Sequence, residues 1–357
     1  MISNFYILGS TAKRPASQRT IFTDGAPDAT FRPGVDMELS HWIPNDTPTQ
    51  YKADTSTEIC MRFAESNTSK GWDLAINNHL DVDGVLAVFT LVHSQIALTH
   101  RQTVIQAAEI GDFSGWGEES AQILFQGLTI LMNDLKASGE DTQRIYEACF
   151  IRAQELLAGK EIEEPRIQAG LRALHDSINR IASGCIERQE LHSRFVHYHI
   201  PADLTVVSLA KTVEVPAFNA EVQDNMWLHP QARNRLDREK VHLVSAQVQE
   251  GWYYDVWYPG YMWADTPNSW RAPGFAFNGS TNGYRYAYAP LEDAVRTLQA
   301  EETADGIWTL AQELSPFSSV AGRNFPIVLS FLTSKNEPVA SKLAPDRVAS
   351  VLAAAFA

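Results

Sequence analysis

Short apolar runs alternate with segments of helical period in the first half of the chain. Strand-like runs cover Thr20–Thr23, Val35–Ser40 and Trp72–Ile76, and each is followed by polar residues or a turn. Residues 85–89, Val-Leu-Ala-Val-Phe, are apolar on nearly all sides, which is typical of a buried helix. The pattern therefore predicts an α/β domain with a mostly parallel sheet and covering helices.

The pattern changes along the chain and predicts a second domain. Long helical segments follow the first domain, and strand-like segments such as Leu204–Ser208 begin after about residue 195. The expected organisation is a loosely ordered N-terminus at 1–19, an α/β domain carrying the site at 20–160, a helical connector at 161–194 and a smaller α+β domain at 195–357.

The turn after the third strand-like run carries the strongest candidate chemistry. His79, Asp81 and Asp83 alternate along it, and Gly84 allows a sharp bend before the apolar helix. Imidazole and carboxylate groups both ligate divalent ions such as Mn²⁺ or Zn²⁺. The alternative is that the carboxylates only cap the following helix. A calcium-binding EF-hand loop is excluded, because Thr90 stands where that loop needs a bidentate glutamate.

Three further residues are candidate ligands of the same site. Asp24 and His41 follow the first two strand-like runs, and parallel strands would bring them to the same sheet edge as the turn. Asp112 lies in a glycine-rich loop after a helix. The expected cofactor is a divalent metal, with Mn²⁺ preferred and Zn²⁺ or Mg²⁺ as alternatives.

The second domain contains a dense aromatic block from Trp252 to Tyr288. Trp257 and Tyr258 are candidates for stacking against a planar substrate, although a core or an interface is the safer interpretation of such residues. Arg271 and Arg285 are candidates for binding a carboxylate or phosphate bidentately. The aromatic density is also compatible with a homodimer.

Charge and composition limit the partners. The net charge is −14 and basic residues do not cluster, so a long nucleic acid is not an expected partner, whereas a small anionic molecule is compatible with a local pocket. No apolar run is long enough to span a membrane, and the first residues do not form a signal peptide. Cys60, Cys149 and Cys185 have no paired spacing, which favours a reducing, cytoplasmic location.

The segment from Asn78 to Gly84, with its apolar helix, resembles the first motif of the DHH phosphoesterase superfamily. By that resemblance His79, Asp81 and Asp83 would bind metal, and Asp112 would correspond to the aspartate of the second motif. The Asp-His-His sequence that names the superfamily does not occur in this chain. Over residues 20–135 the chain also resembles an uncharacterised, mostly bacterial family, which implies no activity.

These observations favour a metal-dependent hydrolase, phosphoesterase-like, that acts on a small anionic substrate. Asp83 and Asp112 are the expected catalytic residues. Two alternatives stay open. One is a ligand- or partner-binding protein that keeps a DHH-like fold without catalysis, and the other is an amide or ester hydrolase with a single metal.

Overall fold

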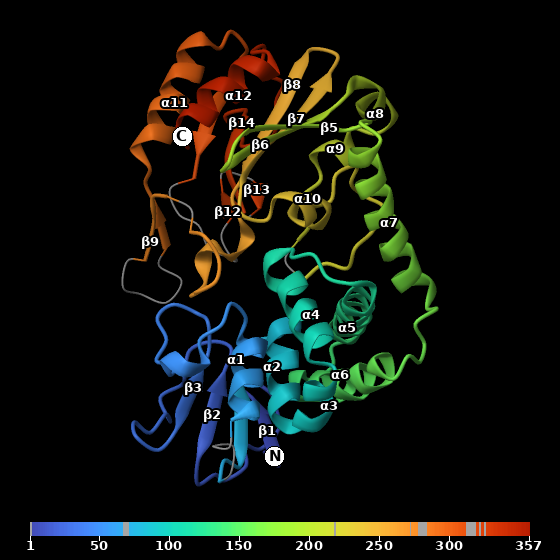
Figure 1. Ribbon diagram of the computed structural model, residues 1–357, viewed down its shortest axis with the longest axis vertical. Helices are drawn as coiled ribbons and strands as arrows, with labels where there is room; N and C mark the ends of the chain where they lie inside the picture. The colour runs from blue at the N-terminus through green and yellow to red at the C-terminus, as the bar shows by residue number, and fades with distance from the viewer. Residues whose placement is uncertain are drawn as a thin grey trace. The chain divides into compact units, whose positions relative to one another are not determined.

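The chain forms two compact units. Unit 1 comprises Met1–Leu171, Phe218–Val222 and Ala264–Ser269, and unit 2 comprises Arg172–Ala217, Gln223–Trp263 and Trp270–Ala357. The computed structural model in Figure 1 describes residues 2–66, 71–217, 219–271, 273–277, 284–311, 319–320, 323–324 and 326–357, with the side chains of 284–285, 319–320 and 323–324 outside the description.

Unit 1 is built on a four-stranded parallel sheet. Its strands are β1 (Asn4–Ile7), β2 (Thr20–Thr23), β3 (Met37–Leu39) and β4 (Leu74–Asn77), in the order β1-β4-β2-β3. All three pairings are parallel, so the carboxyl ends of the strands lie at one edge. The predicted parallel α/β arrangement is therefore confirmed. Strand β1 was not predicted, because the first 19 residues were expected to be loosely ordered.

Helices pack on this sheet or on one another. They are α1 (Ser56–Glu65), α2 (Val82–Val92), α3 (Ser94–Thr99), α4 (Arg101–Phe113), α5 (Glu119–Ala137) and α6 (Thr142–Leu157), with a 3₁₀ turn at Thr49–Tyr51. Figure 1 shows α1 and α2 side by side over the strands. Every residue of α2 from Val82 to Leu91 is buried, as its apolar sequence predicts.

Unit 2 is built on a six-stranded mixed sheet in the order β11-β14-β8-β7-β6-β5. Only the pairing of β6 with β7 is parallel. The six strands are β5 (Glu187–His192), β6 (Phe195–Ile200), β7 (Val241–Val248), β8 (Gly251–Trp257), β11 (Ile307–Leu310) and β14 (Ile327–Leu332). The short strands β9 (Phe275–Phe277) and β10 (Tyr284–Tyr286) pair with each other, as do β12 (Ser319–Val320) and β13 (Arg323–Asn324).

The helices of unit 2 include α10 (Pro230–Asp237), α11 (Ala289–Glu301) and α12 (Pro345–Ala354), together with α8 (Ala202–Val207), α9 (Ala210–Val213) and a 3₁₀ turn at Gly260–Trp263. Helix α7 (Pro165–Ala182) begins in unit 1 and continues into unit 2. Helices α11 and α12 contribute Leu291, Leu298 and Leu352 to the main apolar core of this unit.

Two predictions about the start of unit 2 are wrong. The connector at 161–194 was expected to be helical, but the helix ends at Ala182 and β5 follows. Strand β5 is an exposed edge strand with the polar sequence Glu-Arg-Gln-Glu, so it carries no alternating apolar signal. Residues 204–208 were expected to form a strand, but most of them belong to α8, where Val206 and Val207 are exposed.

Neighbouring residues of α6 test how the core of unit 1 depends on burial. Phe150 is buried and its ring contacts Phe5, Phe89 and Tyr146, whereas Ile151 is 60% exposed on the other face. We expect Phe150→Ala to lower the free energy of unfolding by about 3–5 kcal/mol, through lost burial and a cavity. Ile151→Ala should change it by less than about 0.5 kcal/mol. Chemical denaturation of both variants checks this, and equal losses would contradict the packing described.

Candidate metal centre

The six predicted ligands come together in unit 1. Asp24 follows β2, His41 follows β3, and the remaining members come from the β4–α2 turn, from α2 and from α4. The side chains of Asp24, His41, Asp81, Asp83 and Asp112 are at most 3% exposed, and that of His79 is 22% exposed. Asp112 was expected in a loop but lies in the last turn of α4, which ends at the left-handed Ser114.

The first group of side chains surrounds the imidazole of His41. Its Nε2 atom lies 3.6 Å from Asp24 Oδ1, 3.6 Å from Asp83 Oδ2 and 3.3 Å from Asp112 Oδ2. Its Nδ1 atom lies 2.7 Å from the backbone carbonyl of Asp54. Since a carbonyl only accepts, Nδ1 carries a hydrogen, and in the neutral imidazole the Nε2 lone pair faces the carboxylates. A cation between these groups would relieve that repulsion.

The second group surrounds the imidazole of His79. Its Nε2 atom lies 2.9 Å from Asp24 Oδ2 and 3.0 Å from Asp81 Oδ2, and it has no hydrogen bond of regular geometry. Asp24 Oδ2 likewise has no such hydrogen bond although it is buried. A protonated His79 would form ion pairs with both carboxylates, and a cation would have to replace that proton when the imidazole is neutral.

Asp24 belongs to both groups. The ligand atoms of Asp24, His41 and Asp83 lie within 4.8 Å of one another, as do those of Asp24, His79 and Asp81. Oδ1 of Asp24 also accepts hydrogen bonds from Trp42 Nε1 and Ser56 Oγ, both at 3.0 Å, while Oδ2 faces His79. The carboxylate is thus fixed in orientation with one oxygen toward each imidazole.

Asp81 and Asp83 also cap helices. Oδ1 of Asp81 accepts from the backbone N–H of Gly84 at the start of α2. The two oxygens of Asp83 accept from the backbone N–H groups of Ser56 and Thr57 at the start of α1, both at 2.8 Å. Capping is therefore part of what these carboxylates do, as the alternative interpretation of the turn proposed. It leaves Asp81 Oδ2 directed at His79.

Burial and mutual charge shift the carboxyl groups in different directions. Burial raises the pKa of Asp83 to about 6, helped by the charge of Asp24. Burial and the charge of Asp83 also raise the pKa of Asp112 well above its usual value. For Asp24 burial acts in the same direction, but the neighbouring His79 and His41 outweigh it and lower the pKa to about 2. Asp83 and Asp112 thus resist ionisation in the absence of a cation, whereas Asp24 is stabilised as a carboxylate.

Two glycines allow the close approach of the strand ends. A Cβ atom on Gly84 would lie 2.4 Å from Asn77 Nδ2 and 2.8 Å from Asp24 Oδ2. A Cβ atom on Gly25 would lie 2.2 Å from Asn78 Oδ1, and Gly25 has a φ of +119°. Among the residues that the structure describes, Nδ2 of Asn77 is buried without a hydrogen-bond partner, so it is a further donor at this site, and no motif of the sequence indicates it.

A distant segment supports His41. The backbone N–H of Asp265 donates to the carbonyl of His41 at 2.7 Å. The carboxylate of Asp54, whose carbonyl orients the imidazole, accepts from the Asn268 backbone N–H and the Ser269 hydroxyl, both at 3.0 Å. Residues 264–269 therefore belong to the surroundings of the site. No local pattern could have indicated this, because the contacts join residues more than 200 positions apart.

The predicted substrate-binding residues belong to unit 2. Trp257 and Tyr258 are buried, and the Tyr258 hydroxyl contacts the hydroxyl of Tyr286. Arg271 is exposed, whereas the side chain of Arg285 lies outside the described residues. Trp257 and Tyr258 therefore lie within the packed part of unit 2, as the core interpretation of the aromatic block expects.

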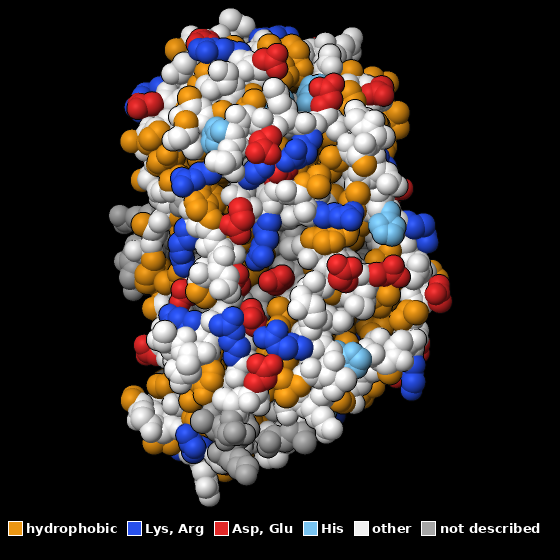
Figure 2. All heavy atoms as spheres, viewed as in Figure 1, with side chains coloured by type: hydrophobic (Ala, Val, Ile, Leu, Met, Phe, Trp, Pro, Cys, Tyr) orange, Lys and Arg blue, Asp and Glu red, His pale blue; other side chains and the backbone are white. Residues whose placement is uncertain are grey.

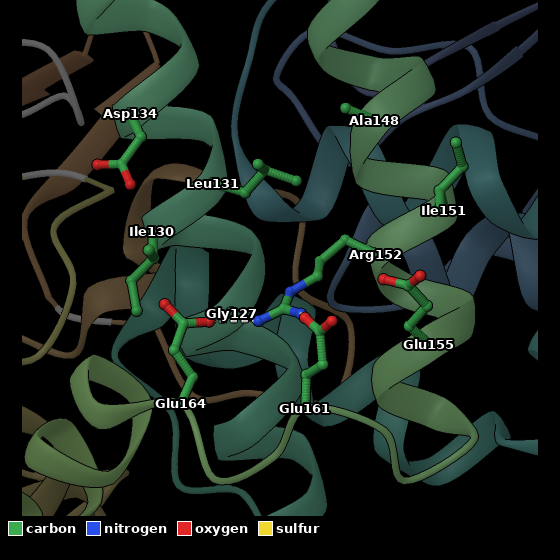
Figure 3. Close-up of a pocket in the computed structure, with 10 residues that line it drawn as sticks. All are labelled: Gly127, Ile130, Leu131, Asp134, Ala148, Ile151, Arg152, Glu155, Glu161 and Glu164. Carbon is green, nitrogen blue, oxygen red and sulfur yellow. Dashed lines mark hydrogen bonds and ion pairs between the residues drawn. The ribbon is translucent and has the colours of Figure 1, made fainter.

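A separate pocket of about 400 Å³ lies between α5 and α6 (Figure 3). Arg152 extends from α6 and forms ion pairs with Glu161 and Glu164, while Asp134 and Glu155 also line it. It contains none of the six candidate ligands. Its arginine is neutralised by the segment that leads into α7, so the pocket indicates helix packing rather than chemistry.

The surface agrees with the charge pattern of the sequence. On the face drawn in Figure 2, Lys and Arg side chains are interspersed with Asp and Glu.

Among the helices that the described residues form, none has the length and apolarity needed to cross a membrane.

Fold and site together define an α/β protein with a buried cluster of carboxylates and imidazoles at the carboxyl edge of a parallel sheet. The chain belongs to the Family of unknown function (DUF6687), whose model matches residues 10–263. The matched region includes all six candidate ligands and ends before Arg271. No curated protein and no solved structure matches the chain.

The charges around His79 generate a prediction for metal-free protein. Burial alone would lower the pKa of His79, but the charges of Asp24 and Asp81 outweigh it and raise the pKa well above 6.5. We expect His79 to be protonated at pH 7 in chelator-treated protein, and Asp81→Asn to lower its pKa. Because a cation competes with this proton, metal uptake should strengthen as the pH rises.

Nuclear magnetic resonance of the histidine ring protons across a pH titration measures the pKa of His79 directly. His79→Gln assigns the signal. A pKa at or below 6.5 in the metal-free wild type would contradict the electrostatic description of this group.

Proposed function

We propose that this protein is a metal-dependent hydrolase, phosphoesterase-like, that acts on a small anionic substrate. The observation that carries the proposal is the pair of carboxylate–imidazole groups that share Asp24. The similarity of the His79–Gly84 turn to the first motif of the DHH phosphoesterases agrees with this choice.

The donor set suits a divalent ion. Each group offers one imidazole nitrogen together with carboxylate oxygens, a mixture that Mn²⁺ accepts readily and that Zn²⁺ also tolerates. Asp112 Oδ1 is buried without an aligned hydrogen bond among the described residues. Asp24 Oδ2 and His79 Nε2 face each other at 2.9 Å, and both would become available as ligands when His79 loses its proton. We infer one ion in each group, held by His41 and Asp83 in the first and by His79 and Asp81 in the second, with Asp24 common to both.

A bound divalent ion would lower the pKa of a water molecule and neutralise charge that develops on the substrate. The residues of the chain would supply the remaining functions. Asp112 Oδ1 has no aligned hydrogen bond among the described residues, and it could take a proton from the attacking water once the charge of the ion holds Asp112 in its ionised form. Asp83 is fixed by two backbone N–H groups, which holds the first group rigid. Nδ2 of Asn77 is an unused donor that can bind a substrate oxygen.

One observation favours a second candidate function, a binding protein without catalysis. The capping hydrogen bonds of Asp81 and Asp83 give both carboxylates a structural task that needs no metal. The absence of the Asp-His-His sequence points the same way. An amide or ester hydrolase with one metal is a further alternative, because a single filled group would also activate water.

Metal content and turnover test the proposal together. Protein purified without chelator should carry about one equivalent of Mn or Zn per filled group. Asp24→Asn should lose most of this metal, because it removes charge from both groups. Asp112→Asn should lower hydrolysis of phosphomonoesters, phosphodiesters or pyrophosphate by at least about 100-fold, with a smaller loss of metal.

Asp36→Asn is the matched control. Asp36 is also a buried carboxylate next to the sheet of unit 1, but it pairs with Arg32 at the other end of the strands. It should retain both metal and turnover. Protein that takes up no Mn²⁺, Zn²⁺ or Mg²⁺ on titration would refute the hydrolase and favour the binding protein.

A further inference from the structure

Unit 2 contains a buried arginine that forms an ion pair with no carboxylate among the residues the structure describes. Arg233 lies in α10 and is only 1% exposed. Among the residues that the structure describes, its only hydrogen bond joins Nη1 to His242 Nδ1 at 3.1 Å, and its Nε is buried without a partner. A buried cation usually has a compensating anion, because desolvation is otherwise uncompensated.

The guanidinium group is held in a defined orientation. Nε2 of His242 lies 2.8 Å from the carbonyl of Asp237, so Nε2 carries the hydrogen and Nδ1 accepts from Arg233. The guanidinium carbon lies 4.1 Å from the ring centre of Trp257, which covers one of its faces. The edge formed by Nε and Nη2 remains for a ligand. Its two parallel N–H groups match the two oxygens of a carboxylate or phosphate.

The nearby carboxylates do not neutralise this cation. Asp237 is in the same helix, but its oxygens are taken by Arg188, Lys240 and the Tyr198 hydroxyl. Asp255 attracts the guanidinium, yet no ion pair within 4 Å joins the two among the described residues. Burial lowers the pKa of Arg233 to about 10, so the group stays charged at neutral pH.

The other neighbours are neutral or are donors. Burial and the charge of Arg233 lower the pKa of both His229 and His242 to about 3, so neither imidazole is charged at pH 7. Within the described part of the chain, Nε1 of Trp257 is a second buried donor without a partner. Unused donors thus accompany the unpaired positive charge.

We propose that Arg233 is an oxyanion-binding residue, which receives a phosphate or carboxylate group on its Nε–Nη2 edge while His242 and Trp257 hold it in place. This site lies wholly in unit 2 and does not depend on the proposed metal centre. A guanidinium that only stacks on Trp257 as part of the core is the competing explanation, and it predicts no anion dependence.

Phosphate binding by the full-length, chelator-treated protein tests this proposal. Calorimetric titration with inorganic phosphate, and separately with acetate, is run at constant ionic strength in chloride. Wild type should bind one of the two anions, and the one bound tells phosphate from carboxylate recognition. Arg233→Gln should weaken binding by about 10-fold to 100-fold, because a charge-assisted bidentate contact is lost. Arg233→Lys should be intermediate, since an ammonium group lacks the fork.

Arg180→Gln is the control, because Arg180 also stacks on a tryptophan, Trp227 at 4.8 Å, but is half-buried and donates to a backbone carbonyl. It should leave anion affinity unchanged. The Nε–H resonance of Arg233 in the wild type gives a readout that does not depend on a variant folding, and it should shift during the titration. No binding of either anion, equal binding by Arg233→Gln, or an unshifted resonance would overturn the proposal.

Discussion

The repulsion among buried carboxylates is the constraint on which unit 1 depends. Asp24, Asp81, Asp83 and Asp112 lie within one cluster, and the free energy of desolvating them must be offset locally. Part of the offset comes from backbone N–H groups at the starts of α1 and α2, and part comes from the two imidazoles. Burial, helped by the charge of Asp83, still raises the pKa of Asp112, so these contributions do not fully stabilise its ionised form. This incomplete stabilisation is the physical argument for a cation.

Fold and candidate chemistry use the same atoms. The carboxylate of Asp83 joins the α2 turn to the first turn of α1, and the carbonyl of Asp54 orients His41 while its carboxylate binds residues 268 and 269. A substitution here therefore changes both the free energy of folding and the geometry of the site. Asp83 accepts capping hydrogen bonds from the backbone, whereas Asp112 accepts none among the residues that the structure describes. A substitution of Asp112 therefore tests function with less effect on the free energy of folding than a substitution of Asp83.

The sequence predicted most of the cluster because most of the ligands directly follow apolar runs, which are recognisable from the local pattern of residues. Asp24, His41 and the His79 turn each follow a strand, and parallel strands have their carboxyl ends at one edge of the sheet. Strands β2, β3 and β4 are neighbours in the observed sheet, so these residues lie together. The prediction that Asp112 lies in a loop is wrong, because Gly111 does not end the helix. That glycine instead lies within α4, where its missing side chain allows Val82 to approach within 3.1 Å of its Cβ position. Pairing of β1 with β4 and docking of residues 264–269 depend on long-range contacts, which no local pattern reports.

The two units present opposite electrostatic problems. Unit 1 buries Asp83 and Asp112, whose ionised forms are not fully stabilised, whereas unit 2 buries Arg233 with its fork edge unused. The net charge of −14 reveals neither, because it averages over a surface on which both signs are interspersed. The charged groups that are desolvated in each unit determine the sign of the ligand that would compensate them. Buried carboxylates in unit 1 favour a cation, and the buried guanidinium in unit 2 favours an oxyanion. The two inferences rest on separate residues in separate units, so each can be tested without the other.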